Sequence, residues 1–194
     1  VSMFYDPMIA KLITWAPTRD SAADLQVEAL DRFEIEGPGL NIDFLSALMQ
    51  HPRFRAGELT TGFIAEEYPE GFEGAPADAM LTRQLAALAA VLTWRQAERA
   101  SMISGQLGAM PLARCDWVVH LGAIAHEVTL GDGAIVDGEL VEGSAEWNPG
   151  DRIAVARTEG GELAVRVAKT RTGWVLTARG ASHRVEVYRP RVAE

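Results

Sequence analysis

The chain has 194 residues, of which 48% are hydrophobic and 23% are charged, and its formal net charge is -9. These values are ordinary for a globular protein with one large or two small domains. A single cysteine excludes an internal disulfide framework and fits a reducing compartment. Residues 1–74 hold 13 acidic against 5 basic residues, which argues against a nucleic-acid-binding surface there. No basic leader precedes the apolar N-terminal run, so we expect no signal peptide.

The first part of the chain is expected to mix α and β structure. Residues 8–15 form an apolar run that predicts a largely buried strand, and Pro17 follows as its end. Thr18 or Asp20 can cap the helix that comes next. The predicted apolar side of this helix consists of Ala22, Leu25, Ala29, Leu30 and Phe33.

A second helix should follow Asn41 and end at His51, because the residue before Pro52 disfavours the helical conformation. His51 is therefore expected to be a helix-end residue and not a ligand. The predicted buried residues of this helix are Ile42, Leu45, Leu48 and Met49. Residues 60–67 predict a last short helix, and residues 68–76 have the composition of a linker.

The longest predicted helix runs over residues 77–101. Ala and Leu favour it, and Asp78 lies where the positive end of the helix dipole favours an anion. Residues 85–92 carry no polar side chain on any face, so we expect this part to be enclosed on all sides. The run is too short for a membrane span, which needs about 20 apolar residues. The chain that follows must therefore surround the helix.

After residue 105 the sequence changes to short alternating segments separated by glycine-rich turns. The predicted strands are residues 116–121, 124–130, 134–136, 140–147, 153–158, 163–169, 174–179 and 183–189. Several show one apolar and one polar face, which is typical of an antiparallel sheet with one wet side. We therefore predict an α+β fold in which an eight-stranded antiparallel barrel, residues 115–190, encloses the long helix. The predicted domains are residues 1–70 and 71–194.

The sequence contains few signs of catalytic chemistry. It has no glycine-rich phosphate loop, no paired-cysteine metal motif and no nucleophile elbow. His120 and His126 flank a turn and could form part of a metal site, but no third ligand is suggested and ordinary strand histidines are the favoured interpretation. Cys115 could be a reactive thiol, although a plain half-buried thiol is the simpler interpretation. The residues alone indicate a protein with no self-contained active site.

A series of family motifs begins with Tyr5-Asp6-Pro7-Met8-Ile9-Ala10-Lys11-Leu12-Ile13. It continues with Ile35-Glu36-Gly37, His51-Pro52-Arg53-Phe54 and Thr60-Thr61-Gly62-Phe63-Ile64. In order and spacing, residues 1–66 resemble the C-terminal end of biotin carboxylase domains, the ATP-grasp enzymes that carboxylate biotin. The resemblance implies a small mixed α/β subdomain. It also implies that Asp6 supports catalysis by pairing with an arginine that this sequence lacks.

Two further stretches, residues 63–72 and 99–106, are similar to the α subunit of propionyl-CoA carboxylase. In that family a helix within an eight-stranded barrel, the BT domain, links the biotin carboxylase to the carboxyltransferase β subunit. The resemblance implies ATP with Mg and biotin as cofactors of the full subunit, with none bound to this piece, which should be inactive alone. It implies two partners, the β subunit and the rest of the α subunit with its biotin carboxyl carrier domain, and neither nucleic acid nor membrane. The expected location is a bacterial cytoplasm or the mitochondrial matrix.

Residues 95–112, at the end of the long helix and beyond it, are predicted to contact the β subunit. The candidate charged contacts are Arg95, Glu98 and Arg99, and the candidate apolar contacts are Met102, Ile103, Leu107 and Met110. Two alternatives remain open, the α subunit of 3-methylcrotonyl-CoA carboxylase and a non-enzymatic barrel that carries a ligand. A lumen filled by the helix would leave a carried ligand no cavity.

Overall fold

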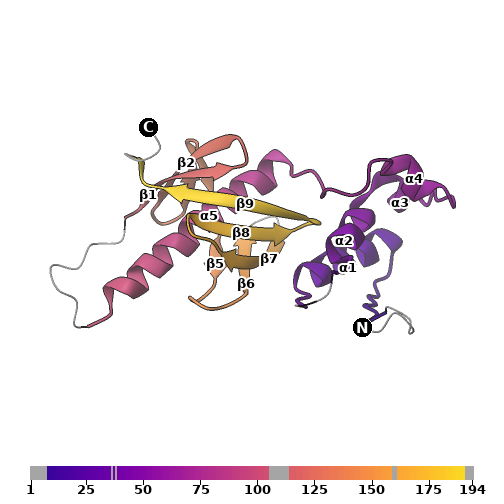
Figure 1. The fold of residues 1–194 in the computed structure, drawn as a ribbon, viewed down its shortest axis with the longest axis horizontal. Helices are drawn as coiled ribbons and strands as arrows, with labels where there is room; N and C mark the ends of the chain where they lie inside the picture. Colours follow the sequence, from indigo (N-terminus) through magenta and orange to yellow (C-terminus); the bar gives the residue numbers. More distant parts are fainter. Residues whose placement is uncertain (1–7, 36, 38, 105–113, 159–160, 191–194) are drawn as a thin grey trace. The chain divides into compact units, whose positions relative to one another are not determined.

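The computed structural model describes residues 8–35, 37, 39–104, 114–158 and 161–190. The chain forms two compact units. The first unit is Val1–Pro76 with Ala178–Ala181, and the second is Ala77–Thr177 with Ser182–Glu194. Figure 1 shows short helices in the first unit, and a long helix with strands around it in the second. The division into domains at residue 70 stays a prediction.

The described part of the first unit contains the helices α1 (Arg19–Asp31), α2 (Ile42–Gln50), α3 (Pro52–Ala56) and α4 (Phe63–Glu67). Thr18 caps α1 by accepting a hydrogen bond from the Ser21 N–H. Of the two predicted caps, Thr18 and Asp20, the first is therefore the observed one. Helix α2 follows Asn41 and ends at His51, also as predicted. The His51 ring then caps α3 by accepting a hydrogen bond from the Arg53 N–H at 3.3 Å. His51 is therefore a helix-end residue.

The strand predicted over residues 8–15 is wrong, because this segment pairs with no other strand among the described residues. Its outer side chains Ile13 and Trp15 are 78% and 81% exposed. On its inner side, the Thr14 hydroxyl donates to the carbonyl oxygen of Ala22 in α1 at 3.1 Å. An apolar run becomes a strand only when a neighbouring strand pairs with its backbone groups, and no described segment does so.

The buried side of helix α1 agrees with the predicted one only in part, at Leu30. Leu25 is 41% exposed, and the buried apolar residues are Ala23, Val27 and Leu30. Asp31 is also buried, and its carboxylate accepts a hydrogen bond at 2.8 Å from the N–H of Arg179, a residue of the same unit. A partner so distant in sequence lies beyond any local pattern.

Helix α5 (Ala79–Ser101) is the axis of the second unit and agrees closely with the predicted helix. The Asp78 carboxylate caps it by accepting a hydrogen bond from the Leu81 N–H at 2.7 Å. Residues 85–92 are buried except for Val91, which is half-buried, so the expected enclosure of the helix is confirmed for most of its faces. Among the described residues, no helix combines the length and the apolar character that a membrane span requires.

The strands of the second unit form one antiparallel sheet that curves around α5 (Figure 1). In the described residues they are β1 (Asp116–Leu121), β2 (Ile124–Leu130), β3 (Ala134–Val136), β4 (Glu139–Val141), β5 (Ser144–Glu146), β6 (Ile153–Thr158), β7 (Gly161–Lys169), β8 (Gly173–Ala178) and β9 (Ala181–Tyr188). Their order in the sheet is β4-β3-β2-β1-β9-β8-β7-β6-β5. The two ends of the sheet, β4 and β5, are therefore neighbours in sequence.

The single strand predicted over residues 140–147 is two strands, β4 and β5, because the chain bends at Gly143. This residue has a φ of 145°, and a Cβ there would lie 2.2 Å from the carbonyl oxygen of Arg157. Beyond the bend the pairing changes, since β4 pairs with β3 and β5 pairs with β6. In the part of the chain that the structure describes, the sheet thus has nine strands in place of eight. The other predicted strands agree with the observed ones to within two residues at each end.

Candidate docking site

Two tryptophans anchor helix α5 inside the barrel in the C-terminal half of the helix, whose C-terminal end at Ser101 is its outer end. The Thr93 hydroxyl accepts a hydrogen bond from the Trp174 indole N–H at 3.0 Å and donates to the Ala89 carbonyl at 2.7 Å. The rings of Trp147 and Trp174 meet edge to face, with centroids 5.4 Å apart. Both rings are almost fully buried. These contacts fix the position at which the helix leaves the sheet.

Arg95 lies one turn after Val91 and is held by β5. Its guanidinium donates to the carbonyl oxygen of Ala145 at 2.6 Å and also to that of Trp147. Because β5 is an end strand, no other strand among the described residues pairs with its outer edge. Arg95 therefore satisfies backbone carbonyls that would otherwise lack a protein partner, and its charge is directed at the barrel.

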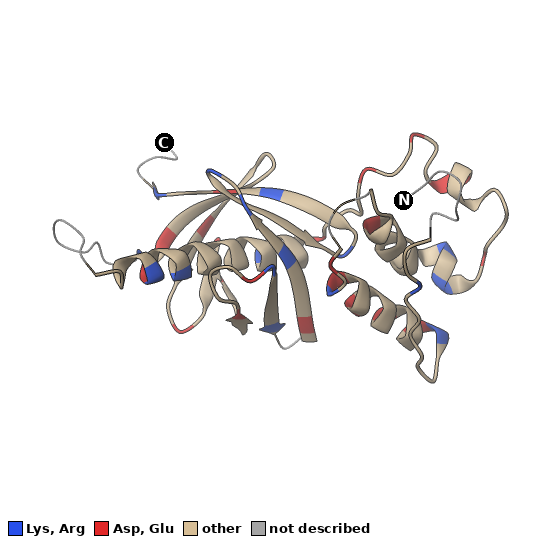
Figure 2. Ribbon diagram, turned by 60° about the horizontal axis from the view of Figure 1, so that its bottom comes forward, with Lys and Arg blue, Asp and Glu red and all other residues tan. Residues whose placement is uncertain are grey.

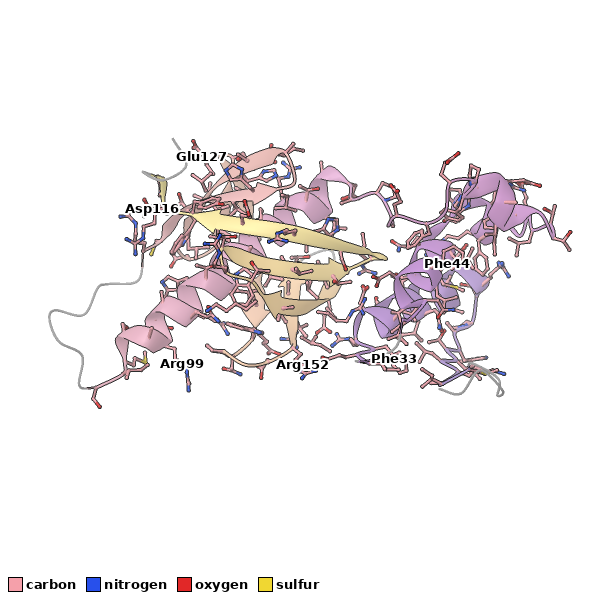
Figure 3. The ribbon with its side chains drawn as sticks, viewed as in Figure 1. Phe33, Phe44, Arg99, Asp116, Glu127 and Arg152 are labelled. Atoms are coloured by element: carbon pink, nitrogen blue, oxygen red, sulfur yellow. The ribbon has the colours of Figure 1, made fainter. Side chains whose placement is uncertain are left out.

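The remaining predicted contact residues with described positions lie beyond Arg95, where α5 extends past the strands (Figure 1). Glu98 is half-buried and Arg99 is exposed, and Figure 3 shows Arg99 on this extended part. Met102 and Ile103 are 71% and 59% exposed. The structure thus places four of the predicted contact residues at one helix end. Asp6, Leu107 and Met110 lie outside the described residues.

A cavity of about 280 Å3 opens beside α5, between the turn that joins β2 to β3 and the bend that joins β4 to β5. Its lining from α5 comprises Gln84, Ala87, Leu88, Val91, Trp94 and Arg95. The strands contribute mainly small or aliphatic side chains, such as Leu130, Ala134, Val141, Ala145 and Ala156. The expectation of a completely filled lumen is therefore wrong at this end of the barrel. The cavity lies at the bend between β4 and β5, the two end strands of the sheet.

The charged groups around the cavity differ in their pairing. Arg157 donates to Glu146 at 2.5 Å and to Glu162 at 2.6 Å, and its hydrogen bond lowers the pKa of the Glu146 carboxyl below the usual value. Asp132 and Glu142 are exposed, and no described residue forms an ion pair with either. Arg95 also lines the cavity and donates only to backbone carbonyls, so the lining side chains without a printed ion pair are two carboxylates and one guanidinium.

The two histidines considered as metal ligands have other partners. His126 is buried, and its Nδ1 lies 2.6 Å from Oδ2 of Asp137. Burial raises the pKa of Asp137, but the hydrogen bonds with His126 and with the Glu127 N–H lower it more, and the result is below the usual value. The His120 ring lies edge-on to that of Tyr188. Among the described residues, no group of three or more His, Cys, Asp or Glu side chains is arranged to hold a metal.

Comparison with known proteins decides the family. Residues 85–194, more than half of the chain, match the family model described as the propionyl-coenzyme A carboxylase BT domain. This chain belongs to the propionyl-CoA carboxylase BT-domain family. Residues 1–66 match a second family model, the biotin carboxylase C-terminal domain. The helix and curved sheet of the second unit are thus the BT fold that the resemblance implied.

The relatives of this BT-domain chain are larger proteins. A propionyl-CoA carboxylase alpha chain from Ruegeria pomeroyi is 43% identical over 201 residues, which cover 100% of this chain and 30% of that protein. The human mitochondrial propionyl-CoA carboxylase alpha chain is 38% identical over 92 residues, covering 47% of this chain and 13% of the relative. A mitochondrial methylcrotonoyl-CoA carboxylase subunit alpha from Dictyostelium discoideum is 52% identical over 64 residues, which cover 33% of this chain and 9% of that protein. The chain thus spans less than a third of their lengths.

Sequence reasoning missed two features of this BT domain. It grouped Arg95 with Arg99, although the first binds β5 and the second is exposed. It also gave no sign of the cavity, whose lining comes from five separate segments of the chain. The interrupted strand was the one available signal, because Gly143 stands in the middle of the predicted strand over residues 140–147.

Proposed function

We propose that this chain is part of the α subunit of a biotin-dependent acyl-CoA carboxylase that acts on propionyl-CoA, and that its second unit docks the carboxyltransferase β subunit. In the whole enzyme, ATP and bicarbonate would carboxylate biotin on the α subunit, and the β subunit would pass the carboxyl group to propionyl-CoA. The match over the full chain to a propionyl-CoA carboxylase alpha chain supports this assignment. The methylcrotonoyl-CoA carboxylase relative matches a third of the chain, which makes that enzyme the second choice.

The cofactors of this reaction, biotin and ATP with Mg, are assigned to the full subunit. The described residues of this chain contain no cluster of acidic side chains suited to a metal ion, and Asp6 lies outside them. The proposed partners of this chain are the β subunit and the rest of the α subunit, including the biotin carboxyl carrier domain.

The exposed outer end of α5 is the observation that carries the docking role. Met102 and Ile103 are large apolar side chains at 71% and 59% exposure, next to the exposed Arg99. The centre of a stable interface is usually apolar, with charged groups around it. A helix held firmly by the barrel up to Arg95 presents these side chains at a defined position, which lowers the entropic cost of binding.

Size-exclusion chromatography of the full-length α subunit with the β subunit tests this role. Substitution of both Met102 and Ile103 by Asp should weaken assembly, because it places two charges in the apolar contact. Met80→Asp is a matched control, since Met80 is 63% exposed in the first turn of the same helix. Assembly of the double variant at wild-type concentrations would contradict the docking role.

A further inference from the structure

The side of α5 that lines the cavity continues to the exposed end of the helix. Gln84, Leu88, Val91 and Arg95 face the cavity, and the same i, i+4, i+7 spacing leads on to Glu98 and Met102. Figure 2 shows an uncharged middle of α5 and charged residues near its outer end. From Val91 to Met102 the helix rises about 16 Å, a distance well within one protein interface.

The cavity is large enough for a single side chain, and its lining is mainly apolar. Its volume of about 280 Å3 lies just below the range of pockets that hold drug-sized ligands, roughly 300–1,000 Å3. Water alone would find few partners on the stretch of wall made by Leu88, Val91 and Ala145. An aromatic or large aliphatic side chain would bury its surface there.

The opening suits an inserted side chain of a partner better than a partner's strand added to the edge of β5. An added strand would need the outer carbonyls of β5, and Arg95 already donates to that of Ala145 and to that of Trp147, the residue after β5. A side chain inserted between β5 and the turn after β2 would leave both hydrogen bonds intact.

The charged side chains around the cavity favour one sign of charge beside the inserted side chain. Arg157 pairs with Glu146 and Glu162, and Arg95 donates to backbone carbonyls. Asp132 and Glu142 have no ion-pair partner among the described residues, so acidic groups outnumber basic ones around the cavity. An occupant with a neighbouring basic group would therefore be favoured over one with an acidic group.

We infer that the cavity beside Val91 receives an apolar side chain of the docking partner, flanked by Lys or Arg, as the anchor of the interface that begins at Met102. This inference rests on the proposed docking role and extends it. The anchor fills the space between Leu88, Val91 and Trp94, and the flanking cation lies near Glu142 and Asp132. A few buried anchors of this kind supply most of the binding energy in protein interfaces.

Filling the cavity from within tests the anchor. Val91→Trp in the full-length α subunit should raise the dissociation constant for the β subunit by at least about tenfold. Ile135→Trp is the matched control, because Ile135 is 44% exposed on β3 and does not line the cavity. This variant should bind within about twofold of wild type.

Reversing the rim charge tests the flanking cation without altering the core. Glu142→Lys should weaken binding several-fold, and the loss should shrink at high salt. Glu127→Lys is the control, because Glu127 is exposed on β2 and does not line the cavity (Figure 3), and it should change the binding little. If Val91→Trp prevents folding, this pair of variants decides the question alone.

The outcomes separate the anchor from the docking role. Normal binding by Val91→Trp and Glu142→Lys, with assembly lost in the Met102 and Ile103 double variant, would overturn the anchor and leave the docking role standing. Normal binding by all of them would overturn both. Unchanged binding by Val91→Trp counts against the anchor whether or not its melting temperature falls, because a larger side chain at a half-buried position can lower stability by overpacking alone.

Discussion

Replacing Arg95 with Met should destabilise the second unit while leaving its packing volume nearly unchanged. Hydrogen bonds from charged groups contribute about 1.5–3 kcal/mol each, and Arg95 makes two of them, to the carbonyls of Ala145 and Trp147. Arg95 is half-buried, so water can replace part of this interaction. We therefore expect the free energy of unfolding to fall by about 2–4 kcal/mol.

Urea unfolding followed by tryptophan fluorescence measures this change, because most tryptophans belong to the second unit. They are Trp94, Trp117, Trp147 and Trp174. Arg99→Met is the control, since Arg99 is exposed one turn further along the same helix, and it should change the free energy by less than about 0.5 kcal/mol. If Arg95→Met costs no more than Arg99→Met, the edge of β5 does not depend on this arginine.

Three further changes test the barrel. Leu85→Ala should lower the free energy of unfolding by about 3–5 kcal/mol, because Leu85 is fully buried, and a loss below about 1 kcal/mol in urea would refute its core position. Gly143→Ala should prevent the normal bend, whereas Gly131→Ala, with open space around it, should melt near the wild-type temperature; equal melting temperatures would refute the close approach. The Glu146 pKa is lowered by its hydrogen bond with Arg157, so its stabilising contribution is present above the ordinary value of 4.5 and is lost as the pH falls through the folded-state value. Glu146→Gln should therefore destabilise at about pH 7 and much less at about pH 3, and an equal loss at both would refute the pairing.

The helices and strands of the second unit could be predicted because their signals are local. The apolar content of residues 85–92 and the cap at Asp78 act within a few turns of α5. The alternation of β1 and the turns around it act over similarly short distances. In the first unit the same approach failed for residues 8–15, since strand formation there required a partner that no described segment provides.

The candidate docking site could be predicted only in part. The exposed helix end with Met102 and Ile103 follows from an apolar stretch placed after the enclosed part of the helix. The different surroundings of Arg95 and Arg99 do not follow from the sequence, because both are basic residues on one helix. Only the placement of β5 beside the helix distinguishes them.

The sequence alone was sufficient to specify a long buried helix, an antiparallel barrel around it, and membership in a carboxylase family through motifs of fixed spacing. The tertiary structure decided which charged side chains have hydrogen-bond partners and where the sheet leaves an opening. The hydrogen bond of Arg95 to Ala145 joins residues 50 positions apart, and that of Asp31 to Arg179 joins residues 148 apart. Propensity and periodicity act over a few residues, whereas such pairs and the cavity beside Val91 arise only when distant segments pack together.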